Sequence, residues 1–96
     1  MSTSGSSKSK VYIALQDNDE SRYIVEAIEQ DNPEAIIIHM PAMVRVEAEG
    51  RLVVKRETVE EVMGRDWDVQ ELHLNLITLG GNVDEDDDCL TLEWNS

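Results

Sequence analysis

The 96-residue sequence contains no phenylalanine, a single cysteine and two prolines, and it is poor in basic residues. The lone Cys89 excludes a disulfide within the chain. Because no apolar stretch typical of a secretory signal lies near the start, we expect a reducing, cytoplasmic location. No apolar run approaches the roughly 20 residues that a membrane span needs. The eight Lys and Arg against 21 Asp and Glu give a formal charge of −13, which argues against nucleic acids and anionic membranes as partners.

Apolar periodicity predicts three strands and a helix in the first half of the chain. Large residues alternate in Val11–Leu15 and again in 44–49, as in half-buried strands. A buried stripe at helical spacing predicts a helix from Ser21 to about Gln30, after an acidic turn. We expect Asn32 to end this helix in the left-handed conformation, just before Pro33. Residues 35–39 form a short β-branched run that favours a strand.

The second half carries stronger helix signals. Thr58 and Glu61 have the spacing of a capping box, which predicts a helix that begins at Thr58 and ends at Gly64, after the strand 52–54. A second acidic cap, Asp68 with Glu71, leads into alternating leucines, and the pattern predicts a strand over 72–79.

The charge density of residues 82–88 predicts an acidic loop between Gly81 and a last strand over 90–94. The order of elements is then strand, helix, strand, strand, repeated once. It predicts an α+β fold of two β-α-β-β units around one small core. We expect a disordered arm at 1–10 and a single domain at 11–96, made of units at about 11–50 and 51–96.

The sequence offers little chemistry of its own. Cys89 lies beside a run of carboxylates, which disfavours its thiolate, so we expect a structural thiol. His39 and His73 are far apart on segments predicted as strands, where solvated or hydrogen-bonded side chains are expected. The run Asp84–Asp88 lacks the glycine and terminal glutamate of a calcium-binding EF-hand loop. No nucleotide-binding glycine motif is present. We therefore predict no catalytic residue, cofactor or metal, and a protein that acts through its surface.

Several segments resemble the small regulatory component of multicomponent phenol hydroxylases, from Val11 to Trp94. They are Val11–Ala14, Gln16–Asp19, Gln30–Pro33, Arg56–Glu61, Trp67–Glu71 and Gly80–Asp88, with Arg22-Tyr23 and Val25–Ile28 in the first helix. Shorter matches at Asn32-Pro33, Glu47–Gly50, Gly64-Arg65 and Gln70–Leu72 resemble the toluene and methane monooxygenase effector proteins. The resemblance implies the same fold of two β-α-β-β units.

The resemblance also implies a function. A protein of this family is expected to carry no cofactor and to bind a di-iron hydroxylase above its buried iron centre. It would thereby promote coupled, NADH- and O2-dependent aromatic hydroxylation. The catalytic residues would belong to the hydroxylase, and a reductase would compete for overlapping surface.

Two groups of residues are predicted to contact the hydroxylase. The first is on the strand Leu74–Leu79, where the methane system carries small polar residues: we expect the outward Asn75 and Thr78, with Leu76 and Ile77, to face the hydroxylase pore. The second is the corner at Met40 and Met43 with Arg45, because flexible methionines suit an adaptable docking surface.

Two other readings stay open on the residues alone. One is a small, cofactor-free α+β enzyme that uses His39 or His73 as a base. The other is an acidic metal-binding protein centred on Asp84–Asp88.

Overall fold

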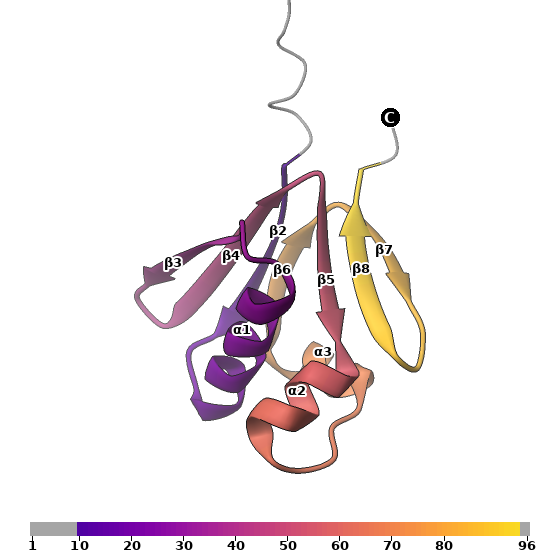
Figure 1. Cartoon of the computed structure of the whole chain (residues 1–96). Coiled ribbons are helices and arrows are strands. Elements are labelled where there is room, and N and C mark those ends of the chain that lie inside the picture. The colour runs from indigo at the N-terminus through magenta and orange to yellow at the C-terminus, as the bar shows by residue number, and fades with distance from the viewer. Residues whose placement is uncertain (1–9, 95–96) are drawn as a thin grey trace, which may run out of the picture.

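The computed structural model describes residues 10–94, so nearly all of the predicted N-terminal arm lies outside the described residues. The chain forms two antiparallel sheets with helices packed beside them (Figure 1). The four-stranded sheet has the order β3 (Ile36–Met40), β4 (Met43–Glu49), β2 (Lys10–Gln16), β6 (Leu76–Gly80). The three-stranded sheet has the order β5 (Arg51–Lys55), β8 (Cys89–Glu93), β7 (Asn82–Glu85). The helices are α1 (Asp19–Asp31), α2 (Arg56–Met63), the 3-10 turn η2 (Val69–Glu71) and α3 (Leu72–Asn75).

The predicted α+β class is confirmed. Apolar side chains from both sheets, α1 and α2 meet in one hydrophobic core, in which Ile13, Ile28 and Leu92 are fully buried. Strand β6 comes from the second half of the chain but pairs with β2 in the first sheet, so the two halves share that sheet. The proposed division into domains and units stays a prediction. No helix in the range 10–94 is long and apolar enough to cross a membrane.

Helix α1 is held at both ends by asparagines. The side chain of Asn18 accepts a hydrogen bond from the amide of Ser21 (2.8 Å), which satisfies an unpaired donor of the first turn. At the other end the prediction of a left-handed Asn32 is wrong, because its φ is −133°. Its side chain instead donates to the carbonyls of Ile28 (2.8 Å) and Val53 (2.8 Å) and accepts from the amide of Val53 (3.0 Å). Asn32 therefore joins the end of α1 to β5.

The capping box predicted at Thr58 is also wrong. Helix α2 starts two residues earlier, at Arg56, and Thr58 is buried inside its first turn. The amide of Arg56 donates to the carbonyl of Asp88 (2.8 Å), so a contact distant in sequence satisfies the start of the helix where a local cap was expected. The predicted end is confirmed, since Gly64 has the left-handed φ of 75°.

The second predicted cap is confirmed, but not the strand after it. Asp68 accepts from the amide of Gln70, and Glu71 accepts from the amide of Asp68, as in a capping box. Residues Leu72–Asn75 then form a helical turn, with Leu72 and Asn75 buried on one side. Residues three apart share a helical face, so the first and last residues of a single turn are buried on the same side. The strand begins only at Leu76.

The acidic segment is partly a strand, which corrects the predicted loop. Asn82–Glu85 pairs with β8 as an edge strand, where its charged side chains stay in water. The hairpin turn is closed by Asp86, whose carboxylate accepts from the amides of Asp88 (2.8 Å) and Cys89 (2.9 Å). These backbone donors hold the pKa of Asp86 below its usual value.

The two tryptophans have different environments. Trp67 is buried (2% exposed) and packs in the core. Trp94 is 47% exposed, because it follows the last residue of β8 at the rim of the sheet. Its indole N–H donates to the carbonyl of Lys10 (2.6 Å), so the polar edge of the ring is satisfied outside the core.

Glu60 provides a pH-dependent contact between α2 and the segment after it. Its carboxylate accepts from the amide of Trp67 (3.0 Å) and from Arg56 (3.3 Å). The backbone donor, aided by the guanidinium, lowers the pKa of Glu60 below its ordinary value of 4.5. A folded-state pKa below the unfolded one contributes stability above the ordinary value, and this contribution is lost as the pH falls through the folded value.

We therefore expect Glu60→Gln to be less stable than the parent at pH 7 and to approach it below pH 4.5. Urea unfolding midpoints at pH 7 and about pH 3 measure this difference. Glu57→Gln is the matched control, since Glu57 is exposed on the same helix. A stability deficit for Glu60→Gln that is equal at both pH values would contradict the assignment.

Candidate functional site

The face of the four-stranded sheet that points away from the core carries residues from both predicted contact groups. The register places side chains in cross-strand rows on this outer face. The rows are Ile36, Glu47, Tyr12 and Gly80, then Ile38, Arg45, Ala14 and Thr78, and then Met40, Met43 and Gln16. The alternate residues of the same strands, such as Val46 and Ile13, are fully buried in the core. We call these three rows together with Ile77 the outer face.

Apolar side chains at the two margins of the outer face are exposed. On β3 the exposed fractions are 56% for Ile36, 36% for Ile38 and 41% for Met40. On β6 Ile77 is 47% exposed. Isolated exposed apolar residues are ordinary, but several on one sheet face mark an interaction surface.

The middle of the outer face is polar, and its charged side chains pair with one another. The guanidinium of Arg45 lies 3.9 Å from the centre of the Tyr12 ring and donates to Glu47 at 2.7 Å. The Tyr12 ring extends over Gly80 on β6, where any Cβ atom would overlap the ring. The outer face therefore has a centre of mutually contacting polar side chains between two apolar margins.

A bulge shapes the β6 margin. Ala14 pairs with Thr78 and Leu15 pairs with Leu76, so Ile77 is an extra residue without a partner on β2. A bulge disrupts the ladder locally and turns side chains that would otherwise alternate. As a result, Ile77 and Thr78 are adjacent in sequence and both exposed.

The structure brings together most of the residues predicted from the sequence. Met40, Met43, Arg45 and Thr78 lie in the three rows of the outer face, beside Ile77. Leu76 does not belong there, because its partly buried side chain packs against the core. Ile36, Ile38 and Tyr12 also lie on the outer face but were not predicted as contact residues. For the two isoleucines the reason is that β3 is apolar at nearly every position, so no alternation marks its outward residues.

Asn75 is not outward, contrary to the prediction. It is 7% exposed and ends α3, and its Oδ1 accepts from Nδ2 of Asn18 at 2.8 Å. Because Asn18 also caps α1, this pair fixes the turn that precedes β6 against the start of α1. The expected exposure was wrong because the strand begins only at Leu76, after Asn75.

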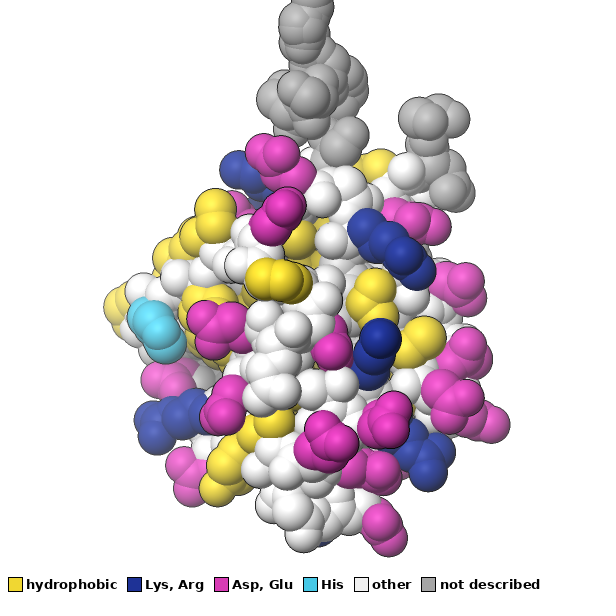
Figure 2. Space-filling view, in the orientation of Figure 1, with side chains coloured by type: hydrophobic (Ala, Val, Ile, Leu, Met, Phe, Trp, Pro, Cys, Tyr) yellow, Lys and Arg dark blue, Asp and Glu magenta, His cyan; other side chains and the backbone are white. Residues whose placement is uncertain are grey.

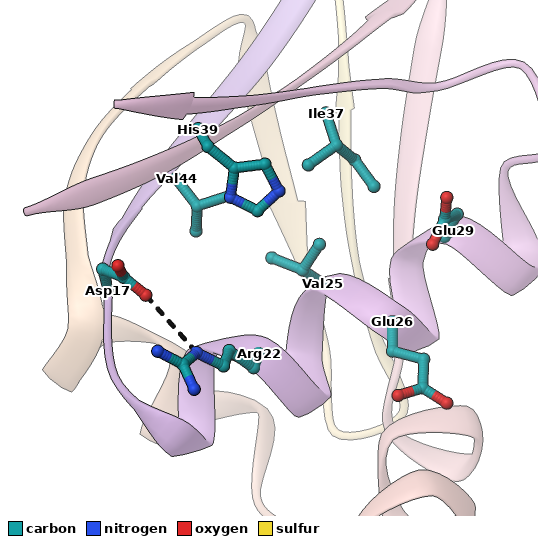
Figure 3. A pocket seen from close by; sticks show the side chains of 8 residues that line it. All are labelled: Asp17, Arg22, Val25, Glu26, Glu29, Ile37, His39 and Val44. Atoms are coloured by element: carbon teal, nitrogen blue, oxygen red, sulfur yellow. Dashed lines mark ion pairs between the residues drawn. The ribbon is translucent and has the colours of Figure 1, made fainter. Parts of the chain in front are cut away.

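A groove opens on the other side of the β3–β4 hairpin, between β3 and α1. It has a volume of about 660 Å³ and is lined by Asp17, Arg22, Val25, Glu26, Glu29, Ile37, His39 and Val44. Figure 3 shows His39 and Ile37 pointing from β3 toward Val25 on α1, with Glu26 and Glu29 along the helix. Figure 2 shows apolar side chains gathered over this hairpin, on a surface otherwise rich in carboxylates.

The other candidate groups are dispersed. His73 contacts Glu85 at 2.8 Å, which joins α3 to β7, and His39 lies in the groove on the far side of the sheet. Cys89 is a half-buried free thiol at the start of β8. Within residues 10–94 no three His, Cys, Asp or Glu side chains are arranged to hold a metal ion.

Comparison with known proteins assigns the chain to a family. The model of the MmoB/DmpM family matches residues 9–93. The chain belongs to the MmoB/DmpM family. A curated member, the "Phenol 2-monooxygenase, stimulatory component DmpM" of Pseudomonas sp. (strain CF600), is 66% identical over 86 residues, which cover 90% of this chain and 96% of the relative.

Solved structures of regulatory proteins share the fold. A chain from a phenol hydroxylase–regulatory protein complex aligns with a TM-score of 0.86 at 60% identity, covering 90% of this chain and 99% of that one. The soluble methane monooxygenase regulatory protein B aligns with a TM-score of 0.71 at 18% identity, over 90% of this chain and 65% of that protein. At that identity the second match shows the fold alone.

Proposed function

We propose that this protein is the stimulatory component of a multicomponent phenol hydroxylase. It binds the di-iron hydroxylase, which holds the catalytic residues, and promotes hydroxylation of phenols coupled to NADH and O2. The observation that carries the proposal is membership of the MmoB/DmpM family with 66% identity to a stimulatory component of phenol 2-monooxygenase. A cytoplasmic location fits a chain with one free thiol that serves an NADH-dependent enzyme system.

The outer face is the surface we assign to the hydroxylase. Its apolar margins provide Met40 and Met43 on one side and Ile77 with Thr78 on the other, and Arg45 lies between them. Methionine and arginine are enriched in protein interfaces, because one adapts its shape and the other combines a flat apolar surface with charge. This assignment is supported by exposure and by the shared face.

The effect on the hydroxylase follows from differential affinity. A regulatory protein shifts its partner toward an active conformation only if it binds that conformation more tightly than the resting one. A tenfold rise in a small active fraction needs about 1.4 kcal/mol of such a difference. A few hot-spot side chains at the centre of an interface each contribute about 2 kcal/mol or more, so a docking surface can supply this difference.

Competition with the reductase is part of the proposal. If the reductase docks on a hydroxylase surface that overlaps the one covered by the outer face, the two proteins exclude each other. Excess reductase should then raise the concentration of this protein needed for half-maximal stimulation. Titrations at two reductase concentrations measure that shift.

The central test is titration of the purified protein into reconstituted hydroxylase and reductase. We expect the rate of phenol hydroxylation and the product formed per NADH consumed to rise and saturate. The isolated protein should turn over no phenol, which separates this proposal from a stand-alone enzyme. A hydroxylase that runs at full rate and coupling without the protein would contradict it.

A further inference from the structure

The four sheet edges of the described chain are not equally protected. An exposed edge strand offers unpaired backbone groups to other strands, and proteins usually block it. On β5 the side chain of Asn32 occupies both backbone groups of Val53. On β6 the bulge at Ile77 interrupts the ladder, and β7 carries Asp84 and Glu85. Strand β3, Ile-Ile-Ile-His-Met, has none of these protections.

The backbone of β3 presents regular hydrogen-bonding groups to its free side. Its hairpin with β4 turns through two residues, Pro41 and Ala42, and Met40 pairs with Met43 at the turn. The closing pair of such a hairpin exchanges its backbone hydrogen bonds, and paired residues then alternate between bonded and non-bonded positions. The N–H and C=O groups of Ile37 and His39 therefore point away from β4, toward the free edge. In Figure 1 β3 is the outermost strand of its sheet.

The groove lies directly beneath this edge. Its floor is apolar, formed by Val25 and Val44 with Ile37, while Glu26 and Glu29 lie along its rim on α1 (Figure 3). The two glutamates are exposed and form no ion pair within residues 10–94, whereas Arg22 on the same rim pairs with Asp17 at 3.5 Å. A strand added to β3 would point alternate side chains into this groove and onto the outer face.

We propose that β3 is a strand-addition site, where an extended segment of the hydroxylase pairs with β3 and places apolar and basic side chains in the groove. This inference rests on the proposed function and extends the docking surface around the hairpin. Charge complementarity identifies the occupant, since the groove rim is acidic and requires Lys or Arg. A second copy of β3 has no Lys or Arg to offer. Pairing of an added strand with a free edge is a common mode of recognition.

The test compares His39→Pro with His39→Ala. Both substitutions remove the imidazole, but only proline removes the edge-facing N–H, and proline is tolerated on the outer side of an edge strand. We expect His39→Pro to bind reconstituted hydroxylase at least tenfold more weakly than His39→Ala, measured by titration of stimulated turnover. Equal binding by the two variants would overturn the inference, while stimulation by the parent protein would leave the proposed function intact.

Hydrogen exchange provides a second measurement that needs no variant. On addition of hydroxylase, the amides of Ile37 and His39 should exchange at least tenfold more slowly, even if His39→Pro fails to fold. Unchanged exchange at both amides in a saturated complex would overturn the inference. Slowing at high concentration of the protein alone would also overturn it, because the occupant would then be a second copy.

Discussion

Replacing Asn32 with alanine is expected to lower the free energy of unfolding by about 2–3 kcal/mol, because the amide and carbonyl of Val53 lose their partner together. The side chain also bonds the carbonyl of Ile28 at the end of α1. Its removal therefore frees a helix end and a strand edge at once. Urea unfolding at neutral pH measures the change.

Two further variants separate hydrogen bonding from a general effect of losing an asparagine. Asn32→Asp keeps the acceptor for the amide of Val53 but loses both donated bonds, so it should also destabilise the protein. Asn82→Ala removes an exposed asparagine from β7 and should change stability by less than about 0.5 kcal/mol. If Asn32→Ala matched Asn82→Ala, the side chain would not connect α1 to β5 as described.

Ile38→Glu should weaken binding to the hydroxylase by about 2–3 kcal/mol, a factor of roughly 30 to 150. Ile38 lies on the outer face in the row of Arg45 and Thr78, and its side chain is 36% exposed. A carboxylate at this position would lose water on docking, and Arg45 opposite it is already paired with Glu47 at 2.7 Å. The concentration of protein needed for half-maximal stimulation of the hydroxylase measures the loss.

The matched control is Val83→Glu. Val83 is an apolar residue of similar exposure, 45%, but it lies on β7 of the other sheet. We expect this variant to stimulate like the parent, and both variants to keep the parent's unfolding midpoint within the small range usual for surface changes. Equal loss of stimulation by the two variants would show that added negative charge alone weakens the complex and that the outer face is not the docking surface.

Local sequence signals predicted those elements whose stabilising contacts are also local. Asp68 and Glu71 satisfy each other's backbone donors within one turn, and the sequence pattern identified them correctly. The predicted start of α2 was wrong because the amide of its first residue, Arg56, donates to the carbonyl of Asp88, which is distant in the sequence. The strand predicted at Leu72–Asn75 was wrong because four residues are too few to distinguish a period of two from a helical turn.

The same distinction applies to the site. Arg45, Met40 and Met43 could be named from the sequence, since β4 alternates clearly and the methionines flank a proline turn. Their proximity to Thr78 could not be predicted, because it depends on the pairing of β6 with β2, two strands that are far apart in the sequence. The exposure of Ile38 could not be predicted, because β3 has apolar residues on both of its faces.

The hydrogen bond between Trp94 and Lys10 has a consequence for the connectivity of the fold. It places the first and last described residues side by side at one end of the molecule (Figure 1). A short covalent bridge could therefore join them, and the backbone could be opened at the solvent-exposed reversal between β7 and β8. The arrangement of the described strands is thus compatible with a circularly permuted order of residues 10–94, in which the β3–β4 hairpin would keep its place in the sheet.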